Sequence, residues 1–281
     1  MFALLSCYST IIAQNVPQTF FIGAVKINIS DNAKEKIQKE MSGSLKNQNY
    51  VDKIVGKMYT HLPIVERILA EENVPDELKY ICVIESMLDA NAVSKSNAVG
   101  FWQLKKETAL GLYLRVDGVI DERKHLIAST KAASAYFKDH NEKLNNWPAC
   151  MLAYRLGLTT FKQSDLAEWA SKSEITLTGD NKDEDYVIRF IAYRTALDNR
   201  YRQIKQEKPD SVPSLLEYNQ TKGRNLSDIA SELKVSVKDI EQHNAWLSSR
   251  SIPDDKDYTL FVPVGGKATT AVIAMNTPQP S

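Results

Sequence analysis

The chain has 281 residues, of which 43% are hydrophobic and 25% are charged, so it can bury the cores of one or two folded domains and is not a disordered chain. Its 35 basic and 35 acidic side chains cancel to a formal net charge of zero. No basic excess is therefore available to neutralise phosphates, which argues against a nucleic acid as the main partner.

The first fourteen residues are apolar and uncharged and end in small or polar side chains (MFALLSCYSTIIAQ). This pattern is typical of the hydrophobic region and cleavage end of a secretory signal peptide, although a basic segment before it is missing. A true start further upstream would explain the missing segment. The alternative is an N-terminal strand or a buried tail.

Cys7 follows Leu4, Leu5 and Ser6, which loosely resembles a lipoprotein attachment box, so lipid anchoring is a second and less favoured alternative. Beyond residue 14 no apolar run approaches the roughly 18 residues that cross a bilayer. We therefore expect no transmembrane span in the mature protein. Its expected location is the periplasm or cell envelope, with outer-membrane association if Cys7 carries a lipid.

The remaining cysteines, Cys82 and Cys150, each lie within an apolar helical pattern, so we expect them to be free thiols in the core. None of the four histidines has an HExxH or CxxC companion. The chain also lacks a phosphate-binding glycine loop and a GxSxG turn. We therefore predict no metal site, no cofactor and no serine nucleophile.

From residue 31 to residue 199 the apolar residues recur mostly at spacings of three and four, which predicts a mainly helical domain. One stripe runs from residue 54 to residue 69, and acidic side chains open a second helix at Asp76. A polar loop with a glycine separates Glu85 from Leu104. Further helices are predicted at about residues 130–144, 147–156, 165–170 and 185–202.

Prolines at 209 and 213 interrupt this pattern and predict a linker at residues 209–214. A compact unit follows at residues 215–265, with a strand near 215–219, two short helices and a strand near 258–262. Ser236 and Asp239 resemble a capping box at the start of its second helix. Residues 266–281 are predicted to be a flexible tail.

The main chemical signal is Glu85, which shares the apolar stripe Leu78, Ile81, Cys82 and Leu88 and lies on a different face from Lys79. Partial burial disfavours the charged form of a carboxyl group, as a general acid that works near neutral pH requires. The alternative is a glutamate at a helix end that turns out to solvent or pairs with a lysine.

The sequence around Glu85 runs IESMLDANAVSKSNAVGFWQLKKETA, and two later segments read VIDERKHLIASTKAAS and WPACMLAYRLG. Together with Tyr186 and Val187, these segments resemble the family 1 lytic transglycosylases, and most of all the membrane-bound transglycosylase D type. The likeness covers roughly residues 45–200. It implies a mainly α (α+β lysozyme-like) catalytic domain at residues 45–208, after an N-terminal extension at residues 15–44.

The resemblance implies cleavage of the β-1,4 bond between N-acetylmuramic acid and N-acetylglucosamine in the glycan strands of peptidoglycan. In this family one glutamate, here Glu85, acts first as acid and then as base, and the product is a 1,6-anhydro sugar. The residues implied to bind substrate are Ser86, Ser94, Gln103, Lys105, Tyr154 and Arg155. Read without the family, Ser94 is a turn or cap residue and Tyr154 a core aromatic.

Three positions depart from the family pattern toward positive charge: Lys105, Arg155 and Lys182. A cation close to Glu85 would stabilise the ionised carboxylate, the wrong state for an initial acid. One alternative is therefore a catalytically impaired scaffold that binds peptidoglycan. A hydrolytic muramidase is a second alternative, independent of these cations. Long cationic side chains can also extend into solvent and miss the carboxylate, or bind acidic stem peptides.

A further pattern lies in residues 215–265 and consists of Tyr218, Lys222, Gly223, Leu226, Ile229, Ala230, Val235, Ser236, Ile240, Asn244, Ile252, Pro253 and Pro263. It resembles a LysM module, which binds glycans that contain N-acetylglucosamine. The residues implied to bind glycan there are Gly223, Arg224, Asn225, Leu226 and Asn244. Arg224 and Asn225 replace the usual Asp-Thr after the glycine. A module of this kind would raise the local concentration of glycan at the catalytic cleft. Proteins of the cell envelope are further possible partners.

Overall fold

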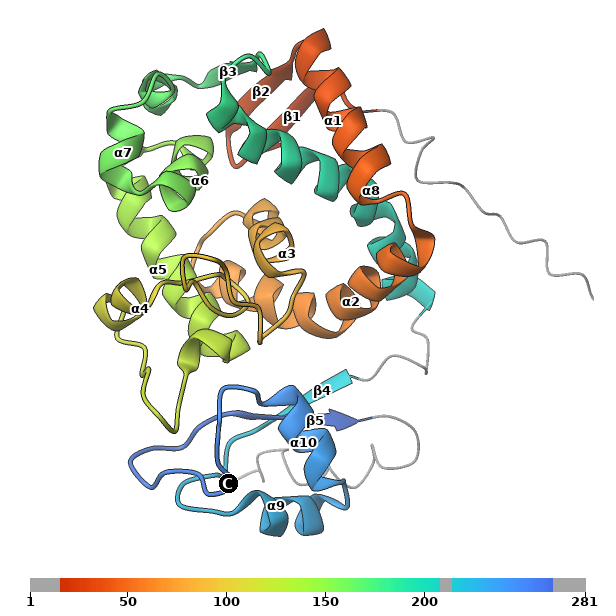
Figure 1. Ribbon diagram of the computed structural model, residues 1–281, viewed down its shortest axis with the longest axis vertical. Coiled ribbons are helices and arrows are strands. Elements are labelled where there is room, and N and C mark those ends of the chain that lie inside the picture. Colours follow the sequence, from red (N-terminus) through yellow and green to blue (C-terminus); the bar gives the residue numbers. More distant parts are fainter. Residues whose placement is uncertain (1–15, 208–213, 265–281) are drawn as a thin grey trace, which may run out of the picture. The chain divides into compact units, whose positions relative to one another are not determined.

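The computed structural model describes residues 16–207 and 214–264 (Figure 1). The predicted signal peptide, Cys7, the linker up to residue 213 and the tail lie outside the described residues. The chain divides into two compact units, which are described separately. The first contains residues 1–55 and 137–203, and the second contains residues 56–136 and 204–281.

The first unit contains a three-stranded sheet in the order β1-β2-β3, made by Thr19–Ile22, Val25–Ile29 and Glu174–Leu177. β1 and β2 form an antiparallel hairpin, and β2 pairs in parallel with β3, with Ile27 opposite Ile175. Phe20 of β1 meets Phe190 edge-to-face, with ring centroids 6.2 Å apart. This sheet was not predicted, and its first two strands lie in the predicted N-terminal extension, because the strand that completes the sheet lies far along the chain.

Of the helices of the first unit, α1 and α8 lie next to the strands β1 and β2 (Figure 1). Ser30 and Asn146 cap α1 and α6 by accepting hydrogen bonds from the backbone of Ala33 and Ala149. The predicted helices at 147–156 and 185–202 are confirmed, whereas the one at 165–170 is a 3₁₀ helix. The bounds are α1 Asp31–Ser44, α2 Gln48–Glu71, α5 Leu126–Leu144, α6 Trp147–Leu156, α7 Leu158–Lys162, α8 Asp185–Glu207 and the 3₁₀ helices Ala167–Ser171 and Lys182–Glu184.

The second unit contains the C-terminal part of α2, the first part of α5, and two short helices between them, α3 (Lys79–Ser86) and α4 (Lys106–Gly111). The 3₁₀ helices Asp76–Leu78 and Glu122–Lys124 precede α3 and α5. The mainly helical, lysozyme-like fold class is thus confirmed. Cys82 and Cys150 are buried free thiols, as predicted.

Residues 214–264, called here the C-terminal module, form a strand, two helices and a strand in the predicted order. These elements are β4 (Ser214–Tyr218), α9 (Leu226–Leu233), α10 (Val237–His243) and β5 (Leu260–Val264). β4 and β5 pair in antiparallel, with Leu216 opposite Val262. Ser236 caps α10 by accepting from the backbone of Asp239, as its spacing predicted.

The C-terminal module packs directly against residues 115–125 of the same unit. Ile120 is fully buried in the module's apolar core and pairs as an isolated β-bridge with Leu247. Asp121 donates its backbone N–H to the carbonyl of Trp246 at 2.8 Å, and Ser248 donates to Val119 at 3.0 Å. The module is therefore a packed part of this unit and is held by more than the chain that leads into it.

His125 lies at the centre of this contact and is 4% exposed. Its Nε2 is 2.9 Å from the carbonyl oxygen of Thr259, and the backbone N–H of Ala128 donates to its Nδ1 at 3.3 Å. A neutral ring protonated on Nε2 satisfies both contacts, because Nδ1 must then accept. Burial lowers the pKa of His125 to about 4, so the structure favours the neutral ring.

Acid should therefore weaken the packing of the module. Because the pKa of His125 is about 4 in the folded state and near 6.5 without burial, its stabilising effect is complete above pH 6.5 and is lost as the pH falls toward 4. Urea unfolding should show that His125→Gln loses about 2–3 kcal/mol less than the wild type between pH 6.5 and pH 4.5.

His243→Gln is the matched control, because His243 is a partly exposed histidine of the same module whose Nδ1 contacts only the carbonyl of its own helix. His61, whose pKa burial also lowers to about 4, remains in both variants. Because the charge of His243 also lowers the pKa of His61, by less than burial does, the control should change the pH dependence only slightly. Equal pH dependence of His125→Gln and the wild type would contradict the assignment.

Candidate active site

Helix α3 is buried on every side except at Glu85, which is its one partly exposed residue. The sequence analysis expected Glu85 to lie with the buried stripe and Lys79 apart from it, and this was wrong for Lys79. Lys79 is 7% exposed, with its Nζ 2.8 Å from Glu66 and 2.7 Å from Asp76. Two carboxylates compensate the buried cation, which is why a lysine is tolerated there.

The chain turns sharply after Ser86, so Glu85 lies in the last turn of α3. Met87 and Leu88 both adopt left-handed backbone conformations, with φ of 51° and 53°. Met87 donates its backbone N–H to Val83 at 2.8 Å, and Lys57 donates to the carbonyl of Met87 at 3.2 Å. Left-handed non-glycine residues cost about 1 kcal/mol or more each, so the surrounding contacts must hold this turn in place.

Ser86 connects the end of α3 to the segment Gly100–Gln103. Its hydroxyl is buried and lies 2.8 Å from the carbonyl oxygen of Phe101 and 3.0 Å from that of Cys82. A hydroxyl has one hydrogen to donate, so these two carbonyls share it. Ser86 was expected to contact substrate, but its side chain points into the protein and positions the residue beside it.

The buried side chains of Trp102 and Phe101 anchor the same segment in the core. The indole of Trp102 is fully buried and donates to the hydroxyl of Thr130 at 2.9 Å. The ring of Phe101 lies 5.6 Å from that of His61, measured between centroids. α2, α3 and α5 therefore all contribute side chains or backbone that hold the segment next to Glu85.

Gln103 and Ser94 both hold the polar loop together. Gln103 has a left-handed backbone conformation and donates its amide to the carbonyls of Ala92 and Gly100, each at 3.0 Å. Its Oε1 remains as the atom that could accept a hydrogen bond from a ligand. Ser94 accepts the backbone N–H of Ala98 at 3.0 Å, which matches the turn or cap alternative.

Gly100 has no room for a side chain. Its φ is +83°, and a Cβ atom would lie 2.0 Å from the carbonyl oxygen of Arg123. The guanidinium of Arg123 pairs with Asp121 at 2.8 Å. Gly100 thus packs the loop against the same segment that contacts the C-terminal module.

The cationic substitutions are all on exposed side chains. Lys105 precedes α4 in the second unit. Arg155 and Lys182 belong to the first unit, where the Arg155 guanidinium lies 6.0 Å from the ring centroid of Tyr186. Tyr154, also in the first unit, is half-buried and stacks on Phe137 with ring centroids 4.7 Å apart.

Two features near these positions escaped the sequence analysis. Glu184 is 2% exposed and accepts hydrogen bonds from Thr178 and from the backbone of Gly179, so it stabilises the turn before α8. Tyr113 follows α4 and is 97% exposed with φ of 62°. Tyr113 lies in the apolar run LGLYL, which is typical of a buried segment, so the sequence does not predict that this side chain is exposed.

The predicted glycan-binding residues of the C-terminal module have mostly internal contacts. Asn244 donates to the carbonyls of Ile240 and Phe261 and accepts from Trp246 and Phe261, which uses its full hydrogen-bonding capacity. Asn225 caps α9, and Leu226 is buried. Arg224 pairs with Glu232 at 2.6 Å and contacts Tyr218, while Gly223 is exposed.

Within residues 16–207 and 214–264, no group of three histidine, cysteine, aspartate or glutamate side chains could hold a metal ion. Over the same residues, no helix combines the length and the apolar character needed to cross a membrane.

Comparison with known proteins places a family domain over the region just described. Residues 63–175 match the family described as "Transglycosylase SLT domain". The chain is 23% identical, over 249 residues, to the membrane-bound lytic murein transglycosylase D of Escherichia coli strain K12 and to that of strain O6:H1 (CFT073). The alignment covers 86% of this chain and 55% of each relative, so the chain spans about half the length of these relatives.

The close packing around Gly100 predicts that adding one methyl group there destabilises the fold. Gly100→Ala should lower the free energy of unfolding by about 3 kcal/mol or more, because the new Cβ meets a backbone carbonyl at a positive φ. Gly111→Ala is the matched control, since a Cβ there meets nothing within 4 Å. Chemical denaturation of both variants checks this, and equal stabilities would contradict the described packing.

Proposed function

Because this chain carries a transglycosylase SLT domain, we propose that it is a lytic transglycosylase that cleaves the glycan strands of peptidoglycan, with Glu85 as its acid and base. The observation that carries the proposal is the place of Glu85. It is the partly exposed residue of an otherwise buried helix, next to the loop that the family motif specifies. Partial exposure lets a substrate reach the carboxyl group, and the buried helix keeps it in place.

The proposed reaction needs one carboxyl group because the sugar brings its own nucleophile. Glu85 gives its proton to the glycosidic oxygen as the bond from that oxygen to the muramoyl C1 breaks. The carboxylate then takes the proton of the muramoyl 6-hydroxyl as O6 bonds to C1. The proton balance on Glu85 is zero, no water is consumed, and a 1,6-anhydro ring forms. Most glycosidases instead need a second carboxylate.

We infer that the cationic side chains contact the substrate. Lys105, Arg155 and Lys182 are exposed, which leaves them accessible to the anionic stem peptides of the substrate. Gln103 keeps one acceptor atom for a sugar hydroxyl or amide. We also propose an envelope location, which the substrate requires.

Replacing the acid tests this directly. Glu85→Gln should lower the release of anhydro-muropeptides from peptidoglycan sacculi by about a hundredfold or more, because the amide cannot transfer the proton. Mass spectrometry of the released fragments is the measurement. Glu107→Gln, on an exposed glutamate of α4, is the matched control and should keep full activity.

The masses of the released fragments also distinguish a lytic transglycosylase from a hydrolytic muramidase and from a binding scaffold. A hydrolytic muramidase would release products one water heavier, with a reducing end in place of the anhydro ring. If the wild type and Glu85→Gln both bind sacculi without releasing fragments, the protein is a binding scaffold and the enzymatic proposal is wrong.

We further propose that the C-terminal module binds glycans containing N-acetylglucosamine near Gly223 and Arg224. The order of its strands and helices supports this, as does its attachment to the unit that carries Glu85. Because the module packs through Ile120 and His125, removing it would uncover a buried surface. Substitutions in the full chain are therefore a better test than truncation.

In the Glu85→Gln background, Arg224→Ala should weaken binding of an N-acetylglucosamine hexamer about fivefold or more, the effect of losing a charged hydrogen-bond donor. Arg250→Ala is the control, because Arg250 is exposed on the same module and pairs with Glu241 at 2.7 Å. Titration calorimetry checks both variants. Equal weakening by both would argue against a site at Arg224.

A further inference from the structure

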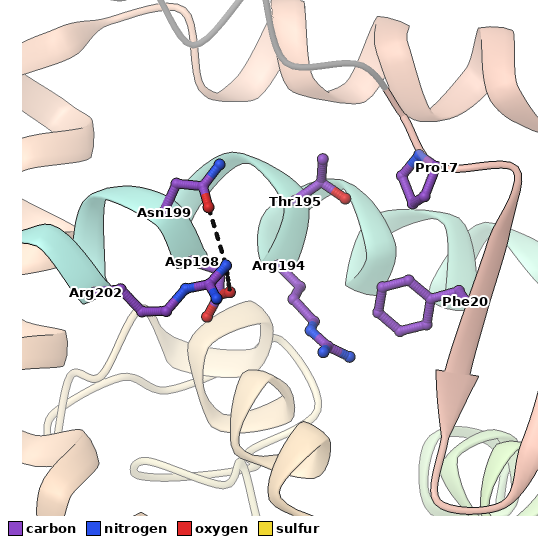
Figure 2. Close-up of a pocket in the computed structure, with 7 residues that line it drawn as sticks. All are labelled: Pro17, Phe20, Arg194, Thr195, Asp198, Asn199 and Arg202. Atoms are coloured by element: carbon purple, nitrogen blue, oxygen red, sulfur yellow. Dashed lines mark hydrogen bonds and ion pairs between the residues drawn. The ribbon is translucent and has the colours of Figure 1, made fainter.

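The first unit contains a pocket of about 340 Å³ between the chain before β1 and helix α8 (Figure 2). This volume is at the lower end of the range of small-molecule sites, which begins at about 300 Å³. The lining residues are Pro17, Phe20, Arg194, Thr195, Asp198, Asn199 and Arg202. None of them belongs to the proposed catalytic site.

Arg194 is the unusual residue of this pocket. Its Nη1 is buried and has no hydrogen-bond partner among the described residues, and the guanidinium carbon lies 4.4 Å from the ring centroid of Phe20. Figure 2 shows this guanidinium pointing to the side of the pocket where Phe20 lies. A buried N–H group without an acceptor is unfavourable, so a ligand that accepts a hydrogen bond there has an advantage.

The other charges of the pocket compensate each other. Arg202 lies 2.7 Å from the carboxylate of Asp198 and donates to Asn199 at 3.0 Å (Figure 2). Arg194, Asp198 and Arg202 follow one another at intervals of four residues, on one face of α8. Two guanidinium groups and one carboxylate leave the pocket with one excess positive charge.

This arrangement selects the kind of ligand. One excess positive charge suits a singly charged anion, whereas the neighbouring Asp198 repels a doubly charged one. The planar guanidinium matches the geometry of a carboxylate. Phe20 and Pro17 provide an apolar wall, which suits a small alkyl group attached to that carboxylate.

We propose that this pocket binds the terminal carboxylate of a short peptide with small apolar side chains. The choice of ligand rests on the proposed function, because the stem peptides of peptidoglycan offer such carboxylates to a protein that holds the glycan strand. Arg194 is the residue that binds the carboxylate, and Phe20 contacts the side chain next to it.

The test uses the full-length protein and two probes, acetyl-D-Ala-D-Ala and its C-terminal amide, followed by titration calorimetry or NMR. The free acid should bind about tenfold or more tightly than the amide, because the amide lacks the charge that Arg194 pairs with. Arg194→Gln should remove this preference, and Arg194→Lys should keep part of it. Equal binding of acid and amide by the wild type overturns the proposal, as does tighter binding of inorganic phosphate.

Arg189→Gln is the matched control. Arg189 is also on α8, has a buried Nε without a hydrogen-bond partner among the described residues and lies over the ring of Tyr193, but it does not line the pocket. The Arg189→Gln protein should bind the free acid as tightly as the wild type does. An equal loss of affinity for the acid in Arg189→Gln and Arg194→Gln would overturn the assignment to Arg194. The comparison of acid and amide on the wild type needs no variant, so misfolding of Arg194→Gln cannot hide a negative result.

Cleavage of peptide-free glycan strands, measured on the same preparations, separates this proposal from the proposed function. Activity without acid-dependent peptide binding would overturn the carboxylate pocket alone. Acid-dependent binding without activity would support the pocket and count against the enzyme.

Discussion

The close approach of Gly100 to the backbone of Arg123 is the contact on which the rest of the candidate site depends. It lets the loop from Gly100 to Gln103 reach the end of α3, where Ser86 shares its hydroxyl hydrogen with the carbonyl of Phe101. Glu85 therefore precedes, in the last turn of a buried helix, the residue that fastens this helix to the loop. A carboxyl group placed this way is open to a ligand and cannot move freely, which is what acid–base chemistry requires.

The segment that meets Gly100 also meets the C-terminal module. Residues 119–125 contribute Ile120 to the module's core, backbone hydrogen bonds to Trp246 and Ser248, and His125 to the carbonyl of Thr259. A module that binds glycan would then be held in register with the loop beside Glu85. If both bound one strand, less orientational freedom would be lost than by two domains on a flexible linker.

Several polar residues that the family resemblance assigned to substrate have internal partners here. Ser86, Ser94 and Asn244 bond to backbone groups, and in Asn244 all four hydrogen-bonding positions are used. Such residues fix the backbone around them and so support the shape of the candidate site. By contrast, Glu85 and Gln103 are partly exposed, and the cations Lys105, Arg155 and Lys182 are exposed.

By itself the sequence determined the mainly helical class, the approximate places of α5, α6 and α8, the buried cysteines and the strand-helix-helix-strand order of the C-terminal module, because these follow from local periodicity, capping and composition. It also singled out Glu85 and the motif around it. Only the tertiary structure decided that Lys79 is buried between Glu66 and Asp76, that β2 pairs with β3, and that Ile120 lies in the core of the module. Each of these depends on partners distant in the sequence, and local spacing carries no information about which distant segment will cover a given face.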